Sequence, residues 1–263
     1  MSDVTQALRV VRYTNKAFWR NPANAFFTFA FPLMFLVIFT ALFGGDDVCS
    51  LGPGNCPPGE LISTSTFYVG AIAAFSIITA TYTNLAINVT FTRDMGILKR
   101  VRGTPMAASS FMVGRILHAI LITVVLVAIV VAFGALFYDA EVPSDTMPAF
   151  LLTIAVGAAS FSALGLALTA AIPNADASPA IVNASILPLL FLSGIFIPIQ
   201  DPNAWYVTVA KIFPVYHFAQ AMNSAYFSVS GSGLEGGHLL ILGLWGLAGV
   251  ILAAMFFSWE PRR

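Results

Sequence analysis

The side chains best able to do chemistry in this chain lie in three places. Two cysteines, Cys49 and Cys56, flank a segment rich in glycine and proline. A basic segment follows at residues 92–106, where clustered cations suit binding to a partner. Uncharged polar side chains gather inside one apolar stretch, where they suit a polar pathway or ordinary hydrogen bonds between helices. These side chains include Thr79, Thr83, Asn84 and Asn88.

Motifs for catalysis or nucleotide binding are missing. No G-x-x-x-x-G-K-[ST] loop occurs, so the chain cannot hold nucleotide phosphates in the manner of a P-loop ATPase. Neither G-x-S-x-G nor H-E-x-x-H occurs, and His118, His217 and His238 are far apart without metal-ligand spacing. We therefore expect no catalytic site, no metal site and no cofactor bound by this chain.

The composition points to a membrane protein. Of 263 residues, 58% are hydrophobic and 9% are charged, whereas a soluble domain has about 25% charged residues. The apolar residues form six stretches that can cross a bilayer as helices, since crossing takes about 20 residues. These stretches are residues 24–44, 61–92, 111–138, 147–172, 179–199 and 238–258. We predict an all-α polytopic fold with six transmembrane helices in a single transmembrane domain, residues 1–263.

Two of the six stretches depart from a simple membrane helix. The second is free of charge for 32 residues, so we expect its helix to project beyond the membrane. The fifth contains Pro188 and ends near Pro198, and each proline frees backbone groups that neighbouring helices or water must satisfy. We expect the fifth helix to be interrupted or to end at these prolines.

The distribution of charge predicts the orientation. The chain has 12 basic and 12 acidic residues. When six spans are drawn, eleven of the basic residues fall on the side of both termini, and Lys211 alone falls on the other. The positive-inside rule then places both termini in the cytoplasm. We expect a multi-pass protein of a bacterial plasma membrane with no nucleic-acid partner.

The segment before the first span predicts a cytoplasmic amphipathic helix at residues 1–22. Val4, Leu8 and Trp19 share one side of this helix with other apolar residues. The cations lie on another side, and they are Arg9, Arg12, Lys16 and Arg20. Such a helix lies at the level of the lipid headgroups, with Trp19 as an anchor and the cations facing anionic lipid or protein. An ordinary basic segment beside the membrane is the alternative.

The rest of the chain divides into a six-span bundle at residues 24–258 and a cytoplasmic tail at residues 259–263. Cys49 and Cys56 fall in the first external loop, between turn-forming glycines and prolines. An even pair of cysteines on the external side favours a disulfide. We expect this disulfide to stiffen the loop.

The basic segment at residues 92–106 predicts a short helix on the cytoplasmic side. Ile97, Leu98 and Val101 can share one face, while the cations lie on the others. Gly103 and Pro105 end the helix. Such a helix can dock on a cytosolic partner; the alternative is a solvated loop that only fixes the topology.

These features together resemble a known family, the type-2 ABC exporter permeases of the daunorubicin-resistance-like group. Arg93-Asp94-Met95-Gly96, followed by Leu98, Arg100 and Gly103-Thr104-Pro105, is similar to a cytoplasmic motif of that family. Glu is common in the family where this chain has Asp94. A second similar segment runs from Phe191 to Pro198 and continues with Trp205 and residues 213–216, although an arginine that often follows is missing near residues 221–225.

The resemblance implies a transmembrane subunit that forms a homodimer, or a heterodimer with a second permease. It also implies two copies of a separate cytosolic ATPase, which would bind ATP and Mg. The N-terminal helix and the basic segment would contact the ATPase, the latter through Arg93, Asp94, Gly96, Leu98, Lys99, Arg100, Gly103, Thr104 and Pro105. Short re-entrant helices would lie between spans five and six, in the segment that holds Ser193, Gly194, Phe196, Pro198, Trp205, Pro214 and Tyr216.

The leading hypothesis is an ATP-driven exporter of hydrophobic or amphipathic solutes, such as drugs, antibiotics or lipid-linked molecules, with membrane lipids as further partners. Ionisable groups are absent from the middle of the spans, since Arg115 and His118 fall near the cytoplasmic edge and Asp176 falls in a turn. Carriers coupled to ions usually need such groups. An ATP-independent carrier or channel, a lipid-modifying membrane enzyme and a non-transporting assembly subunit are the alternatives.

Overall fold

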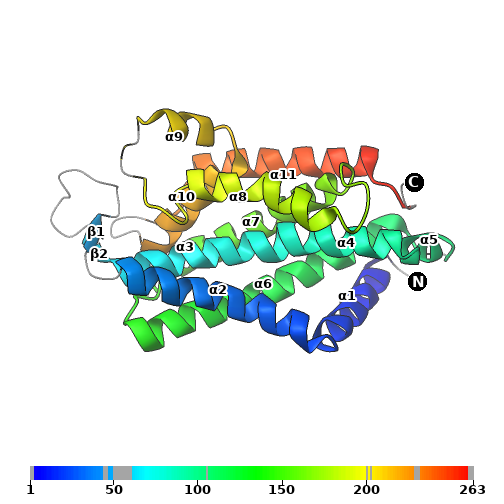
Figure 1. Cartoon of the computed structure of the whole chain (residues 1–263), viewed down its shortest axis with the longest axis horizontal. Coiled ribbons are helices and arrows are strands. Elements are labelled where there is room, and N and C mark those ends of the chain that lie inside the picture. Colours follow the sequence, from blue (N-terminus) through cyan, green and yellow to red (C-terminus); the bar gives the residue numbers. More distant parts are fainter. Residues whose placement is uncertain are drawn as a thin grey trace.

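The computed structural model describes residues 3–43, 47–49, 61–104, 106–199, 201, 203–227 and 232–259. These residues form an elongated bundle of helices (Figure 1). The strands among them are β1 (Asp47–Cys49) and β2 (Leu61–Ser63), which pair antiparallel with Cys49 opposite Leu61. Apart from this short hairpin, the all-α polytopic fold predicted from composition is confirmed.

Five helices in the described part of the chain are long and apolar enough to cross a membrane. They are α2 (Pro22–Phe43), the continuous helix Thr64–Asp94, α6 (Ala108–Tyr138), α7 (Met147–Leu168) and α11 (Gly236–Phe256). They match the first, second, third, fourth and sixth predicted spans. Local hydropathy suffices to find these helices because each contains a long, mainly apolar stretch.

The predicted fifth span is shorter than expected. Helix α8 (Ser178–Leu192) has 15 residues, fewer than the roughly 20 that a bilayer requires. The chain leaves the helix at Ser193, whose hydroxyl donates to the Leu190 carbonyl, and Gly194 follows with a φ of +87°. Glycine adopts this left-handed conformation without strain. The prediction of a helix over residues 179–199 is wrong in its length. The helix runs through Pro188 and ends before Pro198, so neither proline interrupts or ends it as expected. A sixth complete membrane span stays a prediction.

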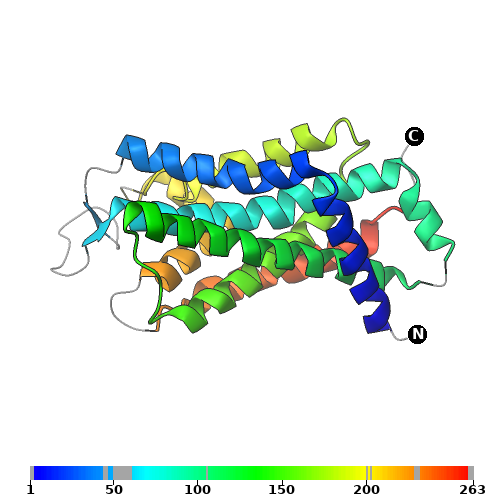
Figure 2. The same ribbon diagram turned by 90° about the horizontal axis from the view of Figure 1, so that it is seen from below.

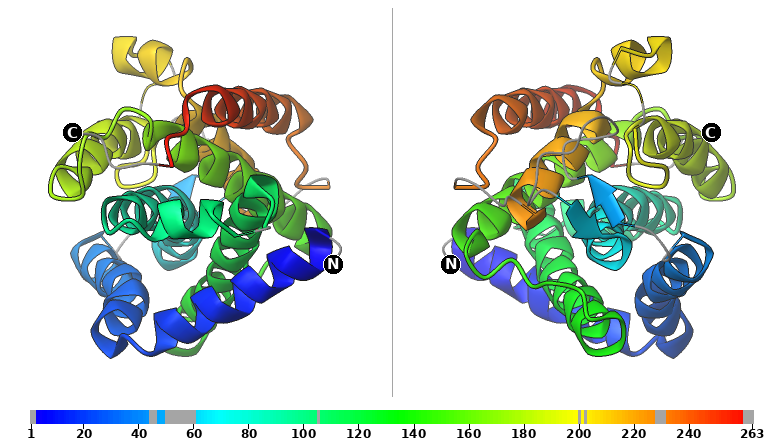
Figure 3. Two further views of the ribbon diagram at one scale, coloured as in Figure 1. Left: turned by 90° about the vertical axis from the view of Figure 1, so that its right-hand side faces the viewer. Right: turned by 90° about the vertical axis from the view of Figure 1, so that its left-hand side faces the viewer.

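The second predicted span forms the centre of the bundle. It consists of α3 (Thr64–Ile78), a π-helical turn η1 (Thr79–Thr83) and α4 (Asn84–Asp94), which together run for 31 residues. That corresponds to about 46 Å, longer than a bilayer core of about 30 Å. Nearly every α3 side chain is buried, and α2, α6, α7, α8 and α10 pack around this helix (Figure 3).

Two helices of the bundle approach each other through small residues. Helices α7 and α11 pack closely, and Gly249 of α11 lies against the α7 backbone. A Cβ added at Gly249 would lie 2.8 Å from the Leu164 nitrogen, so only glycine fits. Small residues allow such backbone contact between membrane helices, where dispersion forces replace the hydrophobic effect.

Two short helices separate α8 from α11. Helix α9 (Trp205–Ala210) exposes Trp205, whereas α10 (Pro214–Phe227) lies packed against α3, α7 and α11. Val215, Phe218 and Met222 of α10 are fully buried. Helix α9 lies at the same end of the bundle as the β1–β2 hairpin (Figure 1).

The two termini lie at the other end. Helix α1 (Asp3–Trp19) crosses α6 there at a steep angle to the long helices (Figure 2), and α5 (Ile97–Arg102) lies beyond the end of α4. The described cations of α1, α4 and α5 are all at this end, which we call the basic end. Lys211 follows α9 at the opposite end.

One half of the expected disulfide lies outside the described residues. Cys49 belongs to β1, but Cys56 lies outside them. The Cys49–Cys56 pairing stays a prediction. The tail at residues 259–263 is described only at Trp259, which packs against Phe111 and Phe257.

Candidate functional site

An apolar cluster holds the elements of the basic end together. It consists of six buried residues from α1, α4, α5, α6 and α7, namely Val10, Leu85, Val89, Leu98, Phe111 and Leu166. Leu98 is 0% exposed, although α5 has only six residues. Burying one leucine side chain contributes roughly 1.5–3 kcal/mol, and it attaches α5 to the apolar cluster.

The outer side of α5 is exposed. Gly96, with a φ of +70°, turns the chain from α4 into α5, a conformation that most other residues adopt only with strain. Four exposed side chains lie just before this turn and on α5, and we call them the α5 surface: Met95, Ile97, Lys99 and Arg100. Met95 precedes Gly96 and the other three belong to α5, so apolar and cationic groups lie close together. Gly103 and Thr104 are also exposed, and Pro105 lies outside the described residues.

Arg93 differs from the α5 surface because it is buried. Its side chain is 1% exposed, and its guanidinium donates hydrogen bonds to the carbonyls that follow α7. The distances are 3.0 Å to the Thr169 oxygen, 2.8 Å to the Ile172 oxygen and 3.3 Å to the Pro173 oxygen. Arg93 therefore caps the end of α7 from the neighbouring helix α4.

Asp94 completes this arrangement. Its Oδ1 accepts from Arg93 Nε at 3.3 Å, and its Oδ2 accepts from the Ala175 amide at 2.5 Å. We call the two residues the Arg93–Asp94 clamp, because together they tie the end of α4 to the turn between α7 and α8. The sequence places both residues in a docking motif, but their side chains bind this chain's own backbone.

Helix α1 packs closely against α6 at a glycine of α6. Ala7 and Val10 are buried, and Gly114 of α6 faces them. A Cβ added at Gly114 would lie 2.6 Å from the Val10 Cβ and 2.8 Å from the Ala7 oxygen. Gln6 also accepts a hydrogen bond from the Ala107 amide just before α6. These contacts fix α1 across the start of α6.

The other two sides of α1 face outward. Val4, Leu8 and Trp19 are 69%, 58% and 53% exposed and form the apolar side predicted from the sequence. The predicted cations, Arg9, Arg12, Lys16 and Arg20, are exposed on the next side. An exposed apolar side beside an exposed basic side is typical of a helix at a membrane interface.

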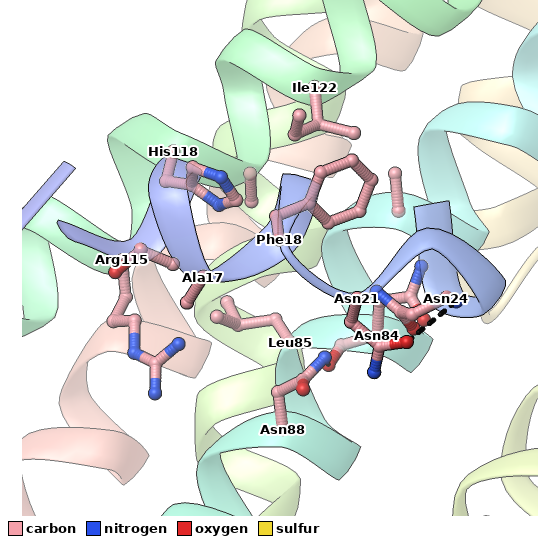
Figure 4. A pocket seen from close by; sticks show the side chains of 13 residues that line it. Ala17, Phe18, Asn21, Asn24, Asn84, Leu85, Asn88, Arg115, His118 and Ile122 are labelled. Carbon is pink, nitrogen blue, oxygen red and sulfur yellow. Dashed lines mark hydrogen bonds between the residues drawn. The ribbon is translucent and has the colours of Figure 1, made fainter. Parts of the chain in front are cut away.

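A cleft of about 200 Å³ lies between the α1–α2 elbow, η1 with α4, and the first half of α6 (Figure 4). Its lining combines amide and cationic side chains with apolar ones. The lining residues are Thr14, Ala17, Phe18, Asn21, Asn24, Ala80, Asn84, Leu85, Asn88, Arg115, His118, Ala119 and Ile122.

Only part of the predicted polar pathway lines this cleft. Asn84 and Asn88 line it. Thr79 donates to the Phe75 and Ser76 carbonyls of its own helix, and neither Thr79 nor Thr83 lines the cleft. The buried hydroxyl of Thr83 has no hydrogen-bond partner among the described residues. The structure thus gathers half of this set around a cavity.

The predicted re-entrant segment lies at the opposite end and is partly buried. Phe196 is 3% exposed, and its ring stacks on Phe39 of α2 at 5.6 Å. Pro214 begins α10 and is buried, Tyr216 is partly buried, and Trp205 is exposed. The segment therefore combines an aromatic contact to α2 with a helix inside the bundle.

Comparison with known families identifies the family of this chain. The sequence profile of the ABC-2 type transporter family matches residues 5–227, from α1 to the end of α10. The chain belongs to this family. The resemblance inferred from the sequence motifs is confirmed.

Two relatives carry the name transport permease ycf38. The protein from Pyropia yezoensis is 24% identical over 216 residues, which are 81% of this chain and 70% of the relative. The protein from Porphyra purpurea is 22% identical over 212 residues, 79% and 69% of the two chains. As a member of the ABC-2 type transporter family with several apolar helices, the chain is a multi-pass membrane protein and a membrane transport subunit. In ABC transporters the ATPase is the partner of this subunit.

Sequence reasoning missed two groupings in this ABC-2 permease. His217 and His238, which seemed unrelated, lie with their Nδ1 atoms 2.8 Å apart and join α10 to α11. Arg115 and His118 share the cleft with Asn21 and Asn24 of the α1–α2 elbow. No motif spacing indicates either grouping, because each is created by helices that meet only in the folded bundle.

Proposed function

We propose that this chain is the transmembrane subunit of an ATP-driven exporter. The cargo would be a hydrophobic or amphipathic solute, such as a drug, an antibiotic or a lipid-linked molecule, moved out of the cytoplasm or its leaflet. ATP and Mg would bind to a separate ATPase, present in two copies. Two permease chains, identical or different, would form the membrane part.

The α5 surface is the observation that supports this proposal most. It is exposed, cationic and apolar, and it lies directly beyond the central helix of the bundle. Leu98 anchors it in the apolar cluster of the basic end, so α5 is held firmly enough to transmit a push. A partner with a complementary groove would bury Met95 and Ile97 and pair with Lys99 and Arg100.

The Arg93–Asp94 clamp supplies a route for that push. A displacement of α5 acts on α4, and the clamp joins α4 to the turn between α7 and α8. Helix α1, which packs on α6 at Gly114, would contact the same ATPase and move with it. Closure of the ATPase would then move α5, α4, the turn between α7 and α8, and α1 together.

The orientation follows from charge. The basic end would face the cytoplasm, in accordance with the positive-inside rule, and α1 would lie in the headgroup layer of a bacterial plasma membrane. At the opposite end, α9 and α10 would form a re-entrant segment. The burial of α10 among α3, α7 and α11 supports this placement.

Co-purification tests the proposal. The tagged full chain is isolated from its native membranes in mild detergent, and the bound proteins are identified by mass spectrometry. We expect an ATPase with a Walker motif in near-stoichiometric amount, and we expect ATP to be required for transport by reconstituted vesicles. Isolation of this chain alone with full transport activity would refute the proposal.

A further inference from the structure

Two basic side chains that line the cleft at the basic end, Arg115 and His118, each have a buried nitrogen without a partner among the described residues. The Nε of Arg115 is buried and has no hydrogen-bond acceptor among the described residues, and the same holds for the Nε2 of His118. His118 is 8% exposed and packs edge-on against Phe18. Buried polar groups are nearly always satisfied, so these two require an explanation.

The remaining contacts of Arg115 do not neutralise its charge. Its Nη2 donates to the Thr92 hydroxyl at 2.9 Å, and its guanidinium lies 5.4 Å from the centre of the Phe111 ring. The Arg93–Asp94 pair is the ion pair that the described part of the chain contains, so no described carboxylate pairs with Arg115. A cation held among membrane helices without a counter-charge is costly, and a bound anion removes that cost.

The cleft is suited to a bound group in size and polarity. Its volume of about 200 Å³ far exceeds the roughly 10–15 Å³ that the centre of one water molecule needs. The side-chain amides of Asn84 and Asn88 line the same cleft, with Asn84 near Asn21 and Asn24 of the α1–α2 elbow (Figure 4), and they can donate further hydrogen bonds to an anion. Arginine with neighbouring amide donors is the usual protein environment of a phosphate.

Polarity changes along the cleft in the direction of the membrane. Arg115 and Asn88 lie near the basic end, whereas Ile122 lies about 10 Å further along α6, and Ala119 and Ala80 also line the deeper part. A headgroup at Arg115 would therefore have apolar surface below it for an acyl chain. A soluble anion has no apolar group that could contact this surface.

We propose that this cleft binds the phosphate-bearing headgroup of an anionic membrane lipid from the leaflet at the basic end. The guanidinium of Arg115 and the ring of His118 would donate to the phosphate oxygens, and the acyl chain would lie against Ala119 and Ile122. Because α1, α2, α4 and α6 all line the site, a bound lipid would hold the α1–α2 elbow against the central helix. This site is independent of the ATPase and of the cargo.

The test is a lipid titration of the purified full chain followed by native mass spectrometry. The probes are phosphatidylglycerol, which is anionic, phosphatidylcholine, which is zwitterionic, and inorganic phosphate alone. We expect one phosphatidylglycerol to bind at least about tenfold more tightly than phosphatidylcholine. Both lipids carry a phosphate anion, but the choline cation of phosphatidylcholine offsets that charge and is repelled by Arg115. Inorganic phosphate alone should neither bind measurably nor displace the lipid.

Variants locate the binding. Arg115→Gln should weaken phosphatidylglycerol about tenfold or more, and His118→Phe, which retains the ring against Phe18, should weaken it severalfold. Arg102→Gln removes an exposed cation of the same end and should leave the affinity within about twofold. If Arg115→Gln does not fold, Ala17→Phe fills the cleft from an exposed position of α1 without changing charge, and it should also abolish tight binding.

Three results would overturn the proposal. Equal affinity for the two lipids would show that no anion is selected. Unchanged affinity in Arg115→Gln, or in Ala17→Phe where the first variant fails to fold, would place the lipid elsewhere. Competition by inorganic phosphate alone would show a site for a soluble anion.

Discussion

Arg93 and Arg115 lie on neighbouring helices at the basic end, and they differ in how their charge is satisfied. Arg93 is fully buried, pairs with Asp94 and donates to three carbonyls after α7. Arg115 donates to one hydroxyl, lies over the Phe111 ring and retains a buried Nε without an acceptor. The charge and hydrogen bonds of Arg93 are satisfied within the chain, whereas Arg115 lines a cleft and keeps a nitrogen unpaired in the described part of the chain.

This difference separates the roles that sequence reasoning gave to the basic residues. Arg93 belongs to the motif that resembles the family's docking segment, but its side chain holds α4 to the α7–α8 turn. The exposed residues of the same motif, Lys99 and Arg100, are free to contact a partner. Arg115 lies outside that motif and lines the cleft proposed to bind lipid.

The largest effect is expected at Arg93. Arg93→Met removes the cation from Asp94 and leaves three backbone carbonyls without their donor, so we expect the chain to lose about 3–5 kcal/mol of stability. Thermal or denaturant unfolding of the purified protein in detergent measures the loss.

Two further variants serve as a control and as a comparison for this prediction. Arg102→Met removes an exposed arginine from α5 and should change stability by no more than about 0.5 kcal/mol. Arg115→Met breaks one hydrogen bond and should cost no more than about 0.5–1.5 kcal/mol. If Arg115→Met destabilised the chain as much as Arg93→Met, the proposed distinction between the two arginines would fail.

A smaller effect is expected at Asp94. Asp94→Asn removes the charge and replaces one acceptor oxygen by an NH2 group that cannot accept a hydrogen bond. Only one of the two donors, Arg93 Nε or the Ala175 amide, then keeps its acceptor, so we expect a loss of about 1.5–3 kcal/mol. The same unfolding measurement applies, with Asp176→Asn as the control because Asp176 is an exposed acid of the same turn. Combined with Arg93→Met, the Asp94 substitution should add little, since the pair is already broken. Full additivity would argue against a clamp.

The sequence predicted the features that depend on neighbouring residues. Hydropathy located the long helices, and the apolar spacing of α5 placed Leu98 on a face that is buried. Ile97, assigned to the same face, is 41% exposed, and Val101 is only partly buried, because so short a helix buries a single side chain. The early end of α8 depends on the φ of Gly194, which hydropathy does not report.

The features that depend on tertiary contacts could not be predicted. The partners of Arg93 are 76 to 80 residues away in the sequence, in a turn that carries no motif. The cleft exists because α1 crosses α6 and then turns into α2, and the crossing depends on the absence of a side chain at Gly114. Sequence spacing contains neither the turn nor the crossing.

The smallest effect on stability is expected at the α5 surface, where the effect on partner binding should be largest. Lys99→Glu with Arg100→Glu changes two exposed side chains, so unfolding should shift by no more than about 0.5 kcal/mol. The central claim is that this surface docks a separate ATPase, and co-purification of the ATPase with this double variant tests it most directly. We predict a correctly inserted, stable chain that retains little or no ATPase and has lost ATP-driven transport. A double variant that recovers the ATPase in wild-type amount and transports at the wild-type rate would contradict the claim.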